Sequence, residues 1–245
     1  MKKTTIITGS NRGIGKALVT QFAKAGYDIW ACARTKNLEF EEYIKRLSEQ
    51  ENVAITPVYF DLTDSDEMKR QVKMILTEAK SIDVLVNCAG IAHGGLFQMT
   101  SVETIKKVFD VNFFSMLELT QLVLRRMVRN KSGSIINLAS ISGLDSRAGN
   151  CAYGTSKAAV IAWTKTLASE VGGLGIRVNA IAPGLTDTNM AKQMESRAGA
   201  EMVENSVMNR LVLPEEIANI AVFLASDNAS IINGQVIRAD GGSKK

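Results

Sequence analysis

Seven short runs of apolar and β-branched residues recur along the chain, and each predicts a β-strand. Polar and apolar positions do not alternate strictly within the runs, which is typical of strands covered on both faces of a parallel sheet. The predicted strands are Thr4–Thr8, Asp28–Ala33, Val53–Phe60, Asp83–Asn87, Ser134–Leu138, Arg177–Ala182 and Gln235–Arg238.

Longer segments, in which apolar residues recur with helical spacing, lie between the predicted strands. They include Ile14–Ala25, Asp66–Ala79, Val102–Val128, Ala158–Val171 and Pro214–Ala225. A strand followed by a helix, repeated from end to end, indicates a doubly wound α/β sheet with right-handed crossovers. Because the chain has only three prolines and no Pro- or Gly-rich linker, we predict a single domain over residues 1–245.

The segment 186–211 has no clear strand partner in this pattern. It is polar and rich in methionine, and its methionines fall between Met190 and Met208. Methionine side chains adapt to irregular surfaces, so they can line a mobile substrate lid or fill a core. We expect the lid, because the segment follows Pro183-Gly184, the pair that comes directly after the sixth predicted strand.

Composition is that of an ordinary globular protein, with 46% apolar and 22% charged residues. The net charge of +4 is mild and dispersed, which argues against a nucleic-acid surface. With no signal peptide and no apolar run of ~18 residues, we expect a cytoplasmic protein that does not contact a membrane. One histidine, and three cysteines without metal or disulfide spacing, predict no metal site and no Ser-His-Asp hydrolase.

A glycine-rich turn joins the first predicted strand to the first predicted helix. Its sequence is Thr8-Gly9-Ser10-Asn11-Arg12-Gly13-Ile14-Gly15. Glycines let the backbone turn sharply and approach a pyrophosphate, which the free N–H groups of the helix N-terminus then bind. Any tight strand-to-helix connection can use glycine, but the position after the first strand of an α/β sheet predicts a dinucleotide site.

The end of the second predicted strand indicates which dinucleotide binds. An acidic residue there binds the ribose 2′-hydroxyl of NAD, whereas arginine suits the 2′-phosphate of NADP. This strand leads to Arg34, and no Asp or Glu follows before Glu39. Arg12, in the glycine turn, can reach the same phosphate, and guanidinium groups bind phosphate through charge-assisted hydrogen bonds. Two solvated surface arginines are the alternative, but the pair predicts NADP(H).

The next two strand ends offer further contacts for a dinucleotide. Asp61 and Leu62 close the third predicted strand, where an adenine ring would lie. The Asp61 carboxylate could accept a hydrogen bond from the exocyclic amine of adenine, or could cap the next helix instead. After the fourth strand, the small residues of Asn87-Cys88-Ala89-Gly90 let the backbone lie against the cofactor ribose.

Ser140, Tyr153 and Lys157 are the candidate catalytic group. Tyr153 and Lys157 are four residues apart, so they share one face of a helix. A free tyrosine has a pKa of ~10, and a nearby ammonium stabilises the phenolate and lowers that pKa into a useful range. Ser140, at the carboxyl end of the fifth predicted strand, can donate a hydrogen bond to a substrate carbonyl oxygen. Tyr-x-x-x-Lys alone is an ordinary helical pair, so its companions decide the interpretation.

Those companions occur in the order and approximate spacing of a short-chain dehydrogenase/reductase, and the resemblance covers the whole chain. It rests on Thr8–Gly15, Asn87–Gly90, Asn112, Ser140, Tyr153–Lys157, Pro183-Gly184, Arg210-Leu211, Pro214–Ala218, Phe223–Asp227 and Asp240–Gly242. The resemblance implies a Rossmann-type domain with a seven-stranded parallel sheet and an NADP(H)-dependent carbonyl chemistry.

The resemblance also implies roles for individual residues. Tyr153 is similar to the general acid that protonates the carbonyl oxygen, and Ser140 to the hydroxyl that polarises it. Lys157 resembles the residue that lowers the tyrosine pKa and holds the nicotinamide ribose, and Asn112 the residue whose helix backbone anchors a relay water. Pro183, Gly184 and Thr186 resemble the wall and the hydrogen-bonding partner of the nicotinamide end.

Residues 210–242 most resemble the 3-oxoacyl-acyl-carrier-protein reductase branch of fatty acid biosynthesis. This implies reduction of a 3-oxoacyl thioester by NADPH in a homotetramer, and the predicted long helices carry apolar residues on more than one face, as subunit burial would require. Leu174 stands where that branch has a docking arginine, which leaves carrier-protein presentation open. A dehydrogenase of a sugar, polyol, steroid or other secondary alcohol, and an inactive NADP(H)-binding protein, are the alternatives.

Overall fold

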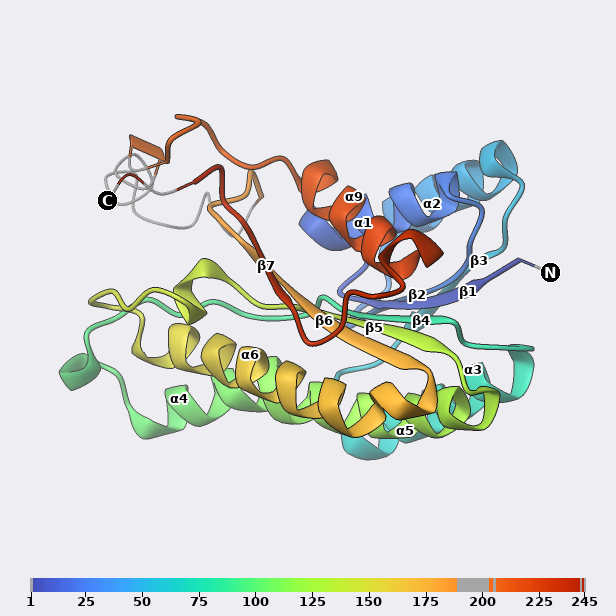
Figure 1. The fold of residues 1–245 in the computed structure, drawn as a ribbon, viewed down its shortest axis with the longest axis horizontal. Coiled ribbons are helices and arrows are strands. Elements are labelled where there is room, and N and C mark those ends of the chain that lie inside the picture. The colour runs from blue at the N-terminus through green and yellow to red at the C-terminus, as the bar shows by residue number, and fades with distance from the viewer. Residues whose placement is uncertain (1, 189–202, 205, 243, 245) are drawn as a thin grey trace.

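Seven parallel strands form one sheet at the centre of the computed structural model, which describes residues 2–188, 203–204, 206–242 and 244 (Figure 1). The strand order is β3-β2-β1-β4-β5-β6-β7. The strands are β1 (Thr4–Thr8), β2 (Asp28–Ala33), β3 (Ile55–Tyr59), β4 (Val84–Asn87), β5 (Gly133–Leu138), β6 (Ile176–Pro183) and β7 (Val236–Ala239). The predicted single Rossmann-type domain with a seven-stranded parallel sheet is confirmed.

Helices cover both faces of the sheet. This is expected, because the strands are apolar throughout and do not alternate between polar and apolar residues. Helices α1, α2 and α9 lie on one face, and α3, α4, α5 and α6 lie on the other (Figure 1). Their bounds are α1 (Gly13–Lys24), α2 (Leu38–Glu51), α3 (Ser65–Glu78), α4 (Val102–Phe109), α5 (Ser115–Asn130), α6 (Cys151–Val171) and α9 (Pro214–Ala225). The sheet therefore has an apolar core on each side.

The two cores use alternate residues of the same strands. Ile7 of β1 packs with Phe22 of α1 and Ile217 of α9, whereas its neighbour Ile6 packs with Met68 of α3 on the opposite face. Both isoleucines are inaccessible to solvent. The sheet is consequently held from both faces, and its strand ends are fixed points from which loops extend.

Three helical segments differ from the prediction. Helix α2 was not predicted, although Asn37 caps it by accepting a hydrogen bond from Phe40 N at 3.1 Å. Helix α6 begins at Cys151 rather than at residue 158, because packing overrides the low helix propensity of its first, small and β-branched residues. The predicted helix over 102–128 is interrupted by a π-helix, Asp110–Phe114, between α4 and α5.

The strand order changes direction between β1 and β4, which is where ligands bind in doubly wound sheets. The loops at the carboxyl ends of the first six strands carry most of the sequence-predicted site residues, whereas Asn112, Tyr153 and Lys157 lie on helical segments. Among the described residues, no helix is long and apolar enough to cross a membrane, and no cluster of three or more metal-binding side chains occurs.

Most of the predicted lid falls outside the described residues, namely 189–202 and 205. The described ends of the segment lie side by side. Thr186 forms a parallel bridge with Val212, Asp187 N donates to Val212 O at 2.9 Å, and Val212 N donates to Leu185 O at 3.0 Å. The lid itself stays a prediction.

Candidate active site

The glycine-rich turn packs tightly against the segment that follows β4. Gly9 has a φ of +67°, and a Cβ atom at this residue would lie 2.9 Å from the Cα of Ala89. A Cβ at Gly15 would lie only 1.9 Å from the carbonyl oxygen of Gly9. These two positions therefore require glycine, because the turn packs closely against the loop after β4 and against itself.

Side chains beside the turn fix it to its neighbours. Thr8 Oγ1 accepts hydrogen bonds from Cys88 N at 3.0 Å and Ala89 N at 3.1 Å, which joins the ends of β1 and β4. The hydroxyl of Ser10 is buried and donates to Cys32 O at 2.9 Å. The backbone N–H of Ser10 donates to the same oxygen at 3.1 Å, so both hydrogen-bond donors of this predicted cofactor residue are used within the protein.

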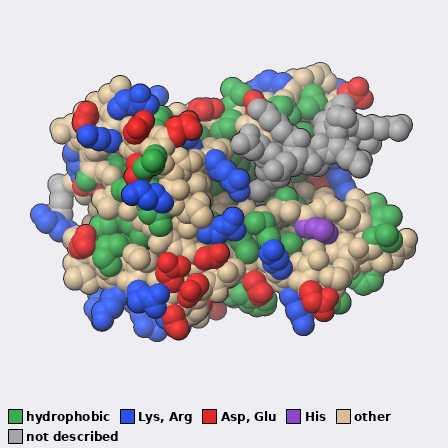
Figure 2. All heavy atoms as spheres, turned by 180° about the vertical axis from the view of Figure 1, so that it is seen from behind, with side chains coloured by type: hydrophobic (Ala, Val, Ile, Leu, Met, Phe, Trp, Pro, Cys, Tyr) green, Lys and Arg blue, Asp and Glu red, His purple; other side chains and the backbone are tan. Residues whose placement is uncertain are grey.

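Arg12 and Arg34 are both exposed near the turn. Arg12 is the N-cap residue of α1 and makes no side-chain capping bond, and Arg34 directly follows β2. In the described part of the chain, neither guanidinium has a hydrogen bond or an ion pair, so both are free to bind an anion. Figure 2 shows several Lys and Arg side chains near the middle of the face opposite that of Figure 1.

Asp61 is not a helix cap, so that alternative for the residue is wrong. The N-cap of α3 is Asp64, whose side chain accepts from Glu67 N at 2.9 Å. The Oδ1 atom of Asp61 instead accepts from Thr63 N at 2.8 Å and from Thr63 Oγ1 at 2.7 Å. These bonds, and the charge of Arg34, hold the pKa of Asp61 below its usual value, so it is an anionic acceptor beside Arg34. Leu62 lies next to it and packs partly against the core.

The three candidate catalytic side chains converge at the carboxyl end of β5. Ser140 is buried two residues beyond this strand, and its Oγ accepts from Ser142 N at 3.1 Å. Tyr153 and Lys157 are on α6, and the Nζ of Lys157 lies 5.9 Å from the centroid of the Tyr153 ring. The same Nζ donates to Leu138 O at 2.7 Å. Lys157 thus lies beneath the tyrosine and is tied to the end of β5.

The pKa of Tyr153 is shifted in the direction opposite to the prediction. Burial raises the pKa of the phenol, and a hydrogen bond with the Ser140 side chain only partly opposes this shift. Burial also lowers the pKa of Lys157 to about 8, so its ammonium form predominates at neutral pH and is lost as the pH rises through about 8. The phenol is therefore protonated at neutral pH, as a proton donor must be.

Asn112 joins three parts of the site from within the π-helix. Its Oδ1 accepts from Ile91 N at 2.8 Å, and its Nδ2 donates to Ile91 O at 2.9 Å and to Ser156 Oγ at 3.0 Å. A Cβ at Gly90 would lie 3.1 Å from Asn112 Oδ1 and 3.5 Å from Lys157 Nζ. The π-helix thus places the side-chain amide of Asn112 between the loop after β4 and helix α6.

A chain of buried amides and hydroxyls runs beneath these loops. Asn87 Nδ2 donates to Thr120 Oγ1 at 3.1 Å and to Asn137 Oδ1 at 2.9 Å, and Asn137 Nδ2 donates to Thr164 Oγ1 at 2.9 Å. Asn87 and Asn137 are register partners in β4 and β5. Asn87 is therefore a residue that fixes strand ends, and its side chain faces these partners in the interior.

The loop after β6 completes the candidate site. Pro183 ends the strand in the interior, and Gly184 N donates to Ala239 O at 2.9 Å. Thr186 is buried, and its hydroxyl donates to Gly184 O at 3.0 Å. A Cβ at Gly13 would lie 3.1 Å from the Cγ2 of Thr188, so this loop reaches the glycine turn.

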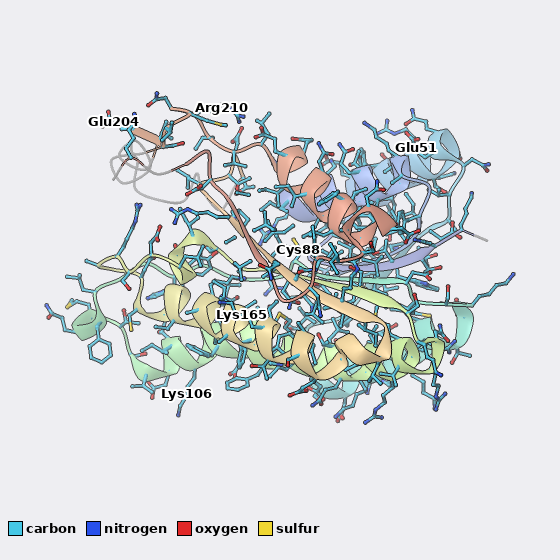
Figure 3. All side chains as sticks on the ribbon, in the orientation of Figure 1. Glu51, Cys88, Lys106, Lys165, Glu204 and Arg210 are labelled. Atoms are coloured by element: carbon cyan, nitrogen blue, oxygen red, sulfur yellow. The ribbon has the colours of Figure 1, made fainter. Side chains whose placement is uncertain are left out.

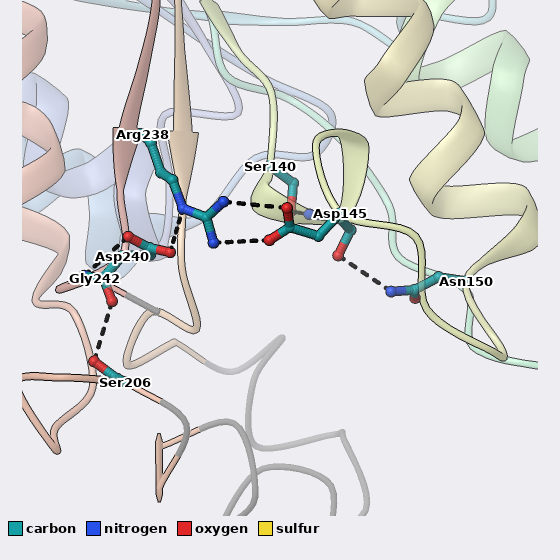
Figure 4. Close-up of polar contacts among 8 residues, drawn as sticks. Ser140, Asp145, Asn150, Ser206, Arg238, Asp240 and Gly242 are labelled. Atoms are coloured by element: carbon teal, nitrogen blue, oxygen red, sulfur yellow. Dashed lines mark hydrogen bonds and ion pairs between the residues drawn. The ribbon is translucent and has the colours of Figure 1, made fainter. Parts of the chain in front are cut away.

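Three charged residues that lie beside the site were assigned no role in it from the sequence. Arg238 of β7 binds Asp145 with two hydrogen bonds and Asp240 with a third (Figure 4). The Asp240-Gly241-Gly242 motif drew attention to this strand end, but its partner Asp145 is 93 residues away in sequence. A separation of this size gives no local signal.

Cys88 follows β4, is half-buried and packs against the core, and lies near the centre of the view in Figure 3. Burial raises the pKa of its thiol to about 12, although the charge of Lys157 opposes this shift. Cys88 is therefore a neutral thiol close to the candidate catalytic lysine. By contrast, Lys106 points outward from α4 (Figure 3).

The cations near the end of α5 lie far from this site. Arg126 donates to the carbonyl oxygens of Leu76 and Lys80 at the end of α3, and Lys131 is the C-cap residue of α5. Lys131 lies at the amino end of β5, whereas Ser140 follows the carboxyl end. Six residues of β5, at ~3.3 Å each, separate these edges by roughly 20 Å.

Comparison with known proteins gives a consistent group of relatives. A family model described as enoyl-(acyl carrier protein) reductase matches residues 9–244. The 3-oxoacyl-(acyl-carrier-protein) reductase FabG of Chlamydia trachomatis serovar D is 38% identical, over 99% of this chain and 97% of the relative. The FabG protein of Thermotoga maritima is 37% identical, over 98% of this chain and 97% of the relative.

Two solved structures resemble the fold closely. A structure titled "ElxO with NADP Bound" has a TM-score of 0.89 and 30% identity, covering 99% of this chain and 98% of that one. The crystal structure of gox2181 has a TM-score of 0.92 and 29% identity, covering 98% of this chain and 95% of that one.

Proposed function

Because the chain belongs to the short-chain dehydrogenase/reductase family, we propose that it uses NADPH to reduce a 3-oxoacyl thioester to the 3-hydroxyacyl thioester. The observation that carries this proposal is the convergence of a protonated phenol, a serine hydroxyl and a buried lysine beside a glycine cradle. The similar FabG proteins are named for this reaction, and the similar ElxO structure has NADP bound.

The described residues fit a dinucleotide phosphate. The glycine turn leads directly into the N-terminus of α1, whose free N–H groups suit a pyrophosphate. The unpaired guanidinium groups of Arg12 and Arg34 suit a 2′-phosphate, and Asp61 suits an adenine amine. When bound, the nicotinamide supplies the hydride.

Each candidate catalytic residue then has a distinct task. The Tyr153 hydroxyl protonates the carbonyl oxygen as this atom becomes negatively charged, and its raised pKa keeps the proton available at neutral pH. Ser140 donates a hydrogen bond to the same oxygen and orients it. Lys157 holds the nicotinamide ribose and, by its position beneath the ring, supports the phenol as it loses its proton. Reaction needs little reorganisation, because these groups are already in place.

Asn112 serves as a positioning residue in this proposal. Its side-chain atoms are engaged with Ile91 and Ser156, so the amide itself holds the loop after β4 against α6. The water relay that the family resemblance implies through the helix backbone stays a prediction.

A second candidate is reduction of a small ketone that no carrier protein presents. It is favoured by Leu174, which offers no charge to an acidic carrier, and by the distance between the α5 cations and Ser140.

Steady-state measurements of NADPH oxidation should distinguish the two candidate functions. The substrates to compare are acetoacetyl-acyl-carrier protein, acetoacetyl-coenzyme A and a panel of sugar, polyol and steroid ketones. We expect the highest kcat/KM with an acetoacetyl thioester. A higher value for any free ketone would contradict the proposed substrate, and binding of NADPH without turnover of any carbonyl would indicate an inactive binding protein.

The pH dependence of NADPH use should report the ionisation of Lys157. With NADPH varied and the carbonyl substrate saturating, kcat/KM reflects ionisations of the free enzyme. Burial lowers the pKa of Lys157 from 10.5 to about 8, so we expect kcat/KM to fall as the pH rises through about 8 and the amine loses its charge. Because the pKa of Tyr153 is raised, ionisation of the phenol does not contribute to the fall in kcat/KM near pH 8. A profile that stays flat to pH 10 would contradict this role of Lys157.

The expected homotetramer and the cytoplasmic location stay predictions. Several large apolar side chains are exposed on the described surface, including Phe97, Phe114 and Phe223. Faces of this kind are suited to burial against further copies of the chain.

A further inference from the structure

Arg238 connects two walls of the candidate active site that come from different parts of the chain. Its Nη1 and Nη2 atoms donate to Asp145 Oδ1 and Oδ2 at 3.1 and 2.7 Å, and its Nε donates to Asp240 Oδ2 at 2.6 Å (Figure 4). We refer to Arg238, Asp145 and Asp240 as the Arg238 cluster. The planar guanidinium binds the Asp145 carboxylate in a bidentate fork, which fixes orientation as well as distance.

The Asp145 end of the cluster belongs to the loop that joins Ser140 to Tyr153. Asp145 lies five residues after Ser140, and its N–H donates to Ile141 O at 2.8 Å. The loop then leads through Asn150, which donates to Ser142 Oγ at 3.2 Å, into the first turn of α6. Holding Asp145 therefore holds the segment on which both proposed carbonyl-binding hydroxyls depend.

The Asp240 end of the cluster belongs to the proposed nicotinamide wall. Gly184 is in contact with Asp240, because a Cβ at Gly184 would lie 2.7 Å from the Asp240 Cβ. Asp240 Oδ1 also accepts from Gly242 N at 3.1 Å, and Asp240 O accepts from Ser206 Oγ at 3.2 Å. The Asp240 side chain is only 8% exposed, so its position is well determined by its surroundings.

We propose that Arg238 is a positioning residue that sets the spacing between the Ser140–Tyr153 loop and the Gly184 wall. The inference rests on the proposed function, because these two walls would hold the carbonyl and the nicotinamide respectively. Hydride transfer depends steeply on the distance between the reacting carbons, and misplacement by ~1 Å can cost about 10²-fold in rate. Loss of the cluster should therefore lower kcat without a matching change in NADPH affinity.

Substitutions in the cluster test this proposal. Arg238→Gln and Asp145→Asn should each lower kcat about tenfold or more, with the dissociation constant of NADPH changed less than threefold. The Arg238→Gln/Asp145→Asn double variant should lose no more than the worse single variant, because both changes remove one interaction. Arg238→Lys keeps the charge but cannot form the fork, so it should recover only part of the activity.

Lys3→Gln is the matched control. It breaks the Lys3–Asp227 ion pair of 2.9 Å, which lies at the amino end of the sheet, away from the candidate site. This variant should keep the wild-type kcat, even where its melting temperature falls as much as that of Arg238→Gln. Equal kcat values for wild type and Arg238→Gln, or equal losses in Arg238→Gln and Lys3→Gln, would overturn the proposal.

Amide hydrogen exchange separates this inference from the proposed function. Residues 141–150 should exchange faster in Arg238→Gln than in wild type, and should be unchanged in Lys3→Gln. Unchanged exchange in Arg238→Gln would overturn the inference whatever the activity. If the wild-type protein reduced no carbonyl, the proposed function would fail, and the exchange and NADPH-binding data would still decide whether Arg238 joins the two walls.

Discussion

Replacing Tyr153 with phenylalanine is expected to lower kcat for carbonyl reduction by about 10²–10⁴-fold, the usual contribution of a general acid. The substitution removes only the hydroxyl, so the ring can still pack above Lys157, whose Nζ lies 5.9 Å from its centroid. Affinity for NADPH should therefore persist. Stopped-flow measurement of NADPH oxidation would report the chemical step, and fluorescence titration would report cofactor binding.

Tyr43→Phe provides the control for this experiment. The Tyr43 hydroxyl is 2.6 Å from Thr20 Oγ1, between α1 and α2, and is remote from Ser140. Its loss should leave kcat within about twofold of wild type. Wild-type turnover by Tyr153→Phe would refute proton donation by the phenol. A loss of NADPH binding that accounts for the whole decrease would instead assign Tyr153 to the cofactor site.

Removing both exposed arginines should shift the cofactor preference of the protein. Charge-assisted hydrogen bonds contribute ~1.5–3 kcal/mol each, and 1.4 kcal/mol corresponds to tenfold in affinity. Because Arg12 and Arg34 are exposed, we take the low end, about tenfold each. The Arg12→Ala/Arg34→Ala variant should therefore raise KM for NADPH about 100-fold and leave KM for NADH nearly unchanged.

Arg129→Ala removes a cation of the same type from the last turn of α5, at the amino end of the sheet. It controls for the loss of one of the two positive charges, and it should leave the ratio of the two KM values unchanged. Equal increases in KM for NADPH and NADH in the double variant would show that the arginines do not read the 2′-phosphate. Raising the ionic strength should weaken NADPH binding in wild type more than in the double variant.

The sheet was predictable because each strand is short, apolar and bounded by a helix. Every predicted strand is present with its ends shifted by at most two residues. Helix α2 also carried readable signals, since Phe40, Ile44 and Leu47 recur at helical spacing behind the Asn37 cap. Its many charged residues obscured that pattern. The start of α6 at Cys151 was harder to predict from the sequence, because the burial of Ala152 and Gly154 depends on the rest of the fold.

The electrostatics of the site could not be obtained from sequence spacing alone. The four-residue interval between Tyr153 and Lys157 correctly places them on one helix, but burial determines their pKa values. Desolvation raises the pKa of Tyr153 and lowers that of Lys157, and the lysine donates to Leu138 O rather than to the phenol. Likewise, the π-helix around Asn112 has no simple periodic signature, and the pairing of Arg238 with Asp145 depends on which strand lies at the sheet edge.

The buried pair formed by Asn87 and Asn137 has a consequence for how the protein folds. In parallel strands that are apolar on both faces, the pattern of hydrophobic residues distinguishes one alignment from another less clearly than strict alternation would. Sliding β4 by two residues against β5 would separate these two amides and leave their donors without acceptors. Each buried donor without a hydrogen bond would cost about 1–3 kcal/mol of stability. The amides therefore select one alignment of the central strands. This selection fixes how far Gly90 and Ser140 lie from one another along the strand direction, independently of any ligand.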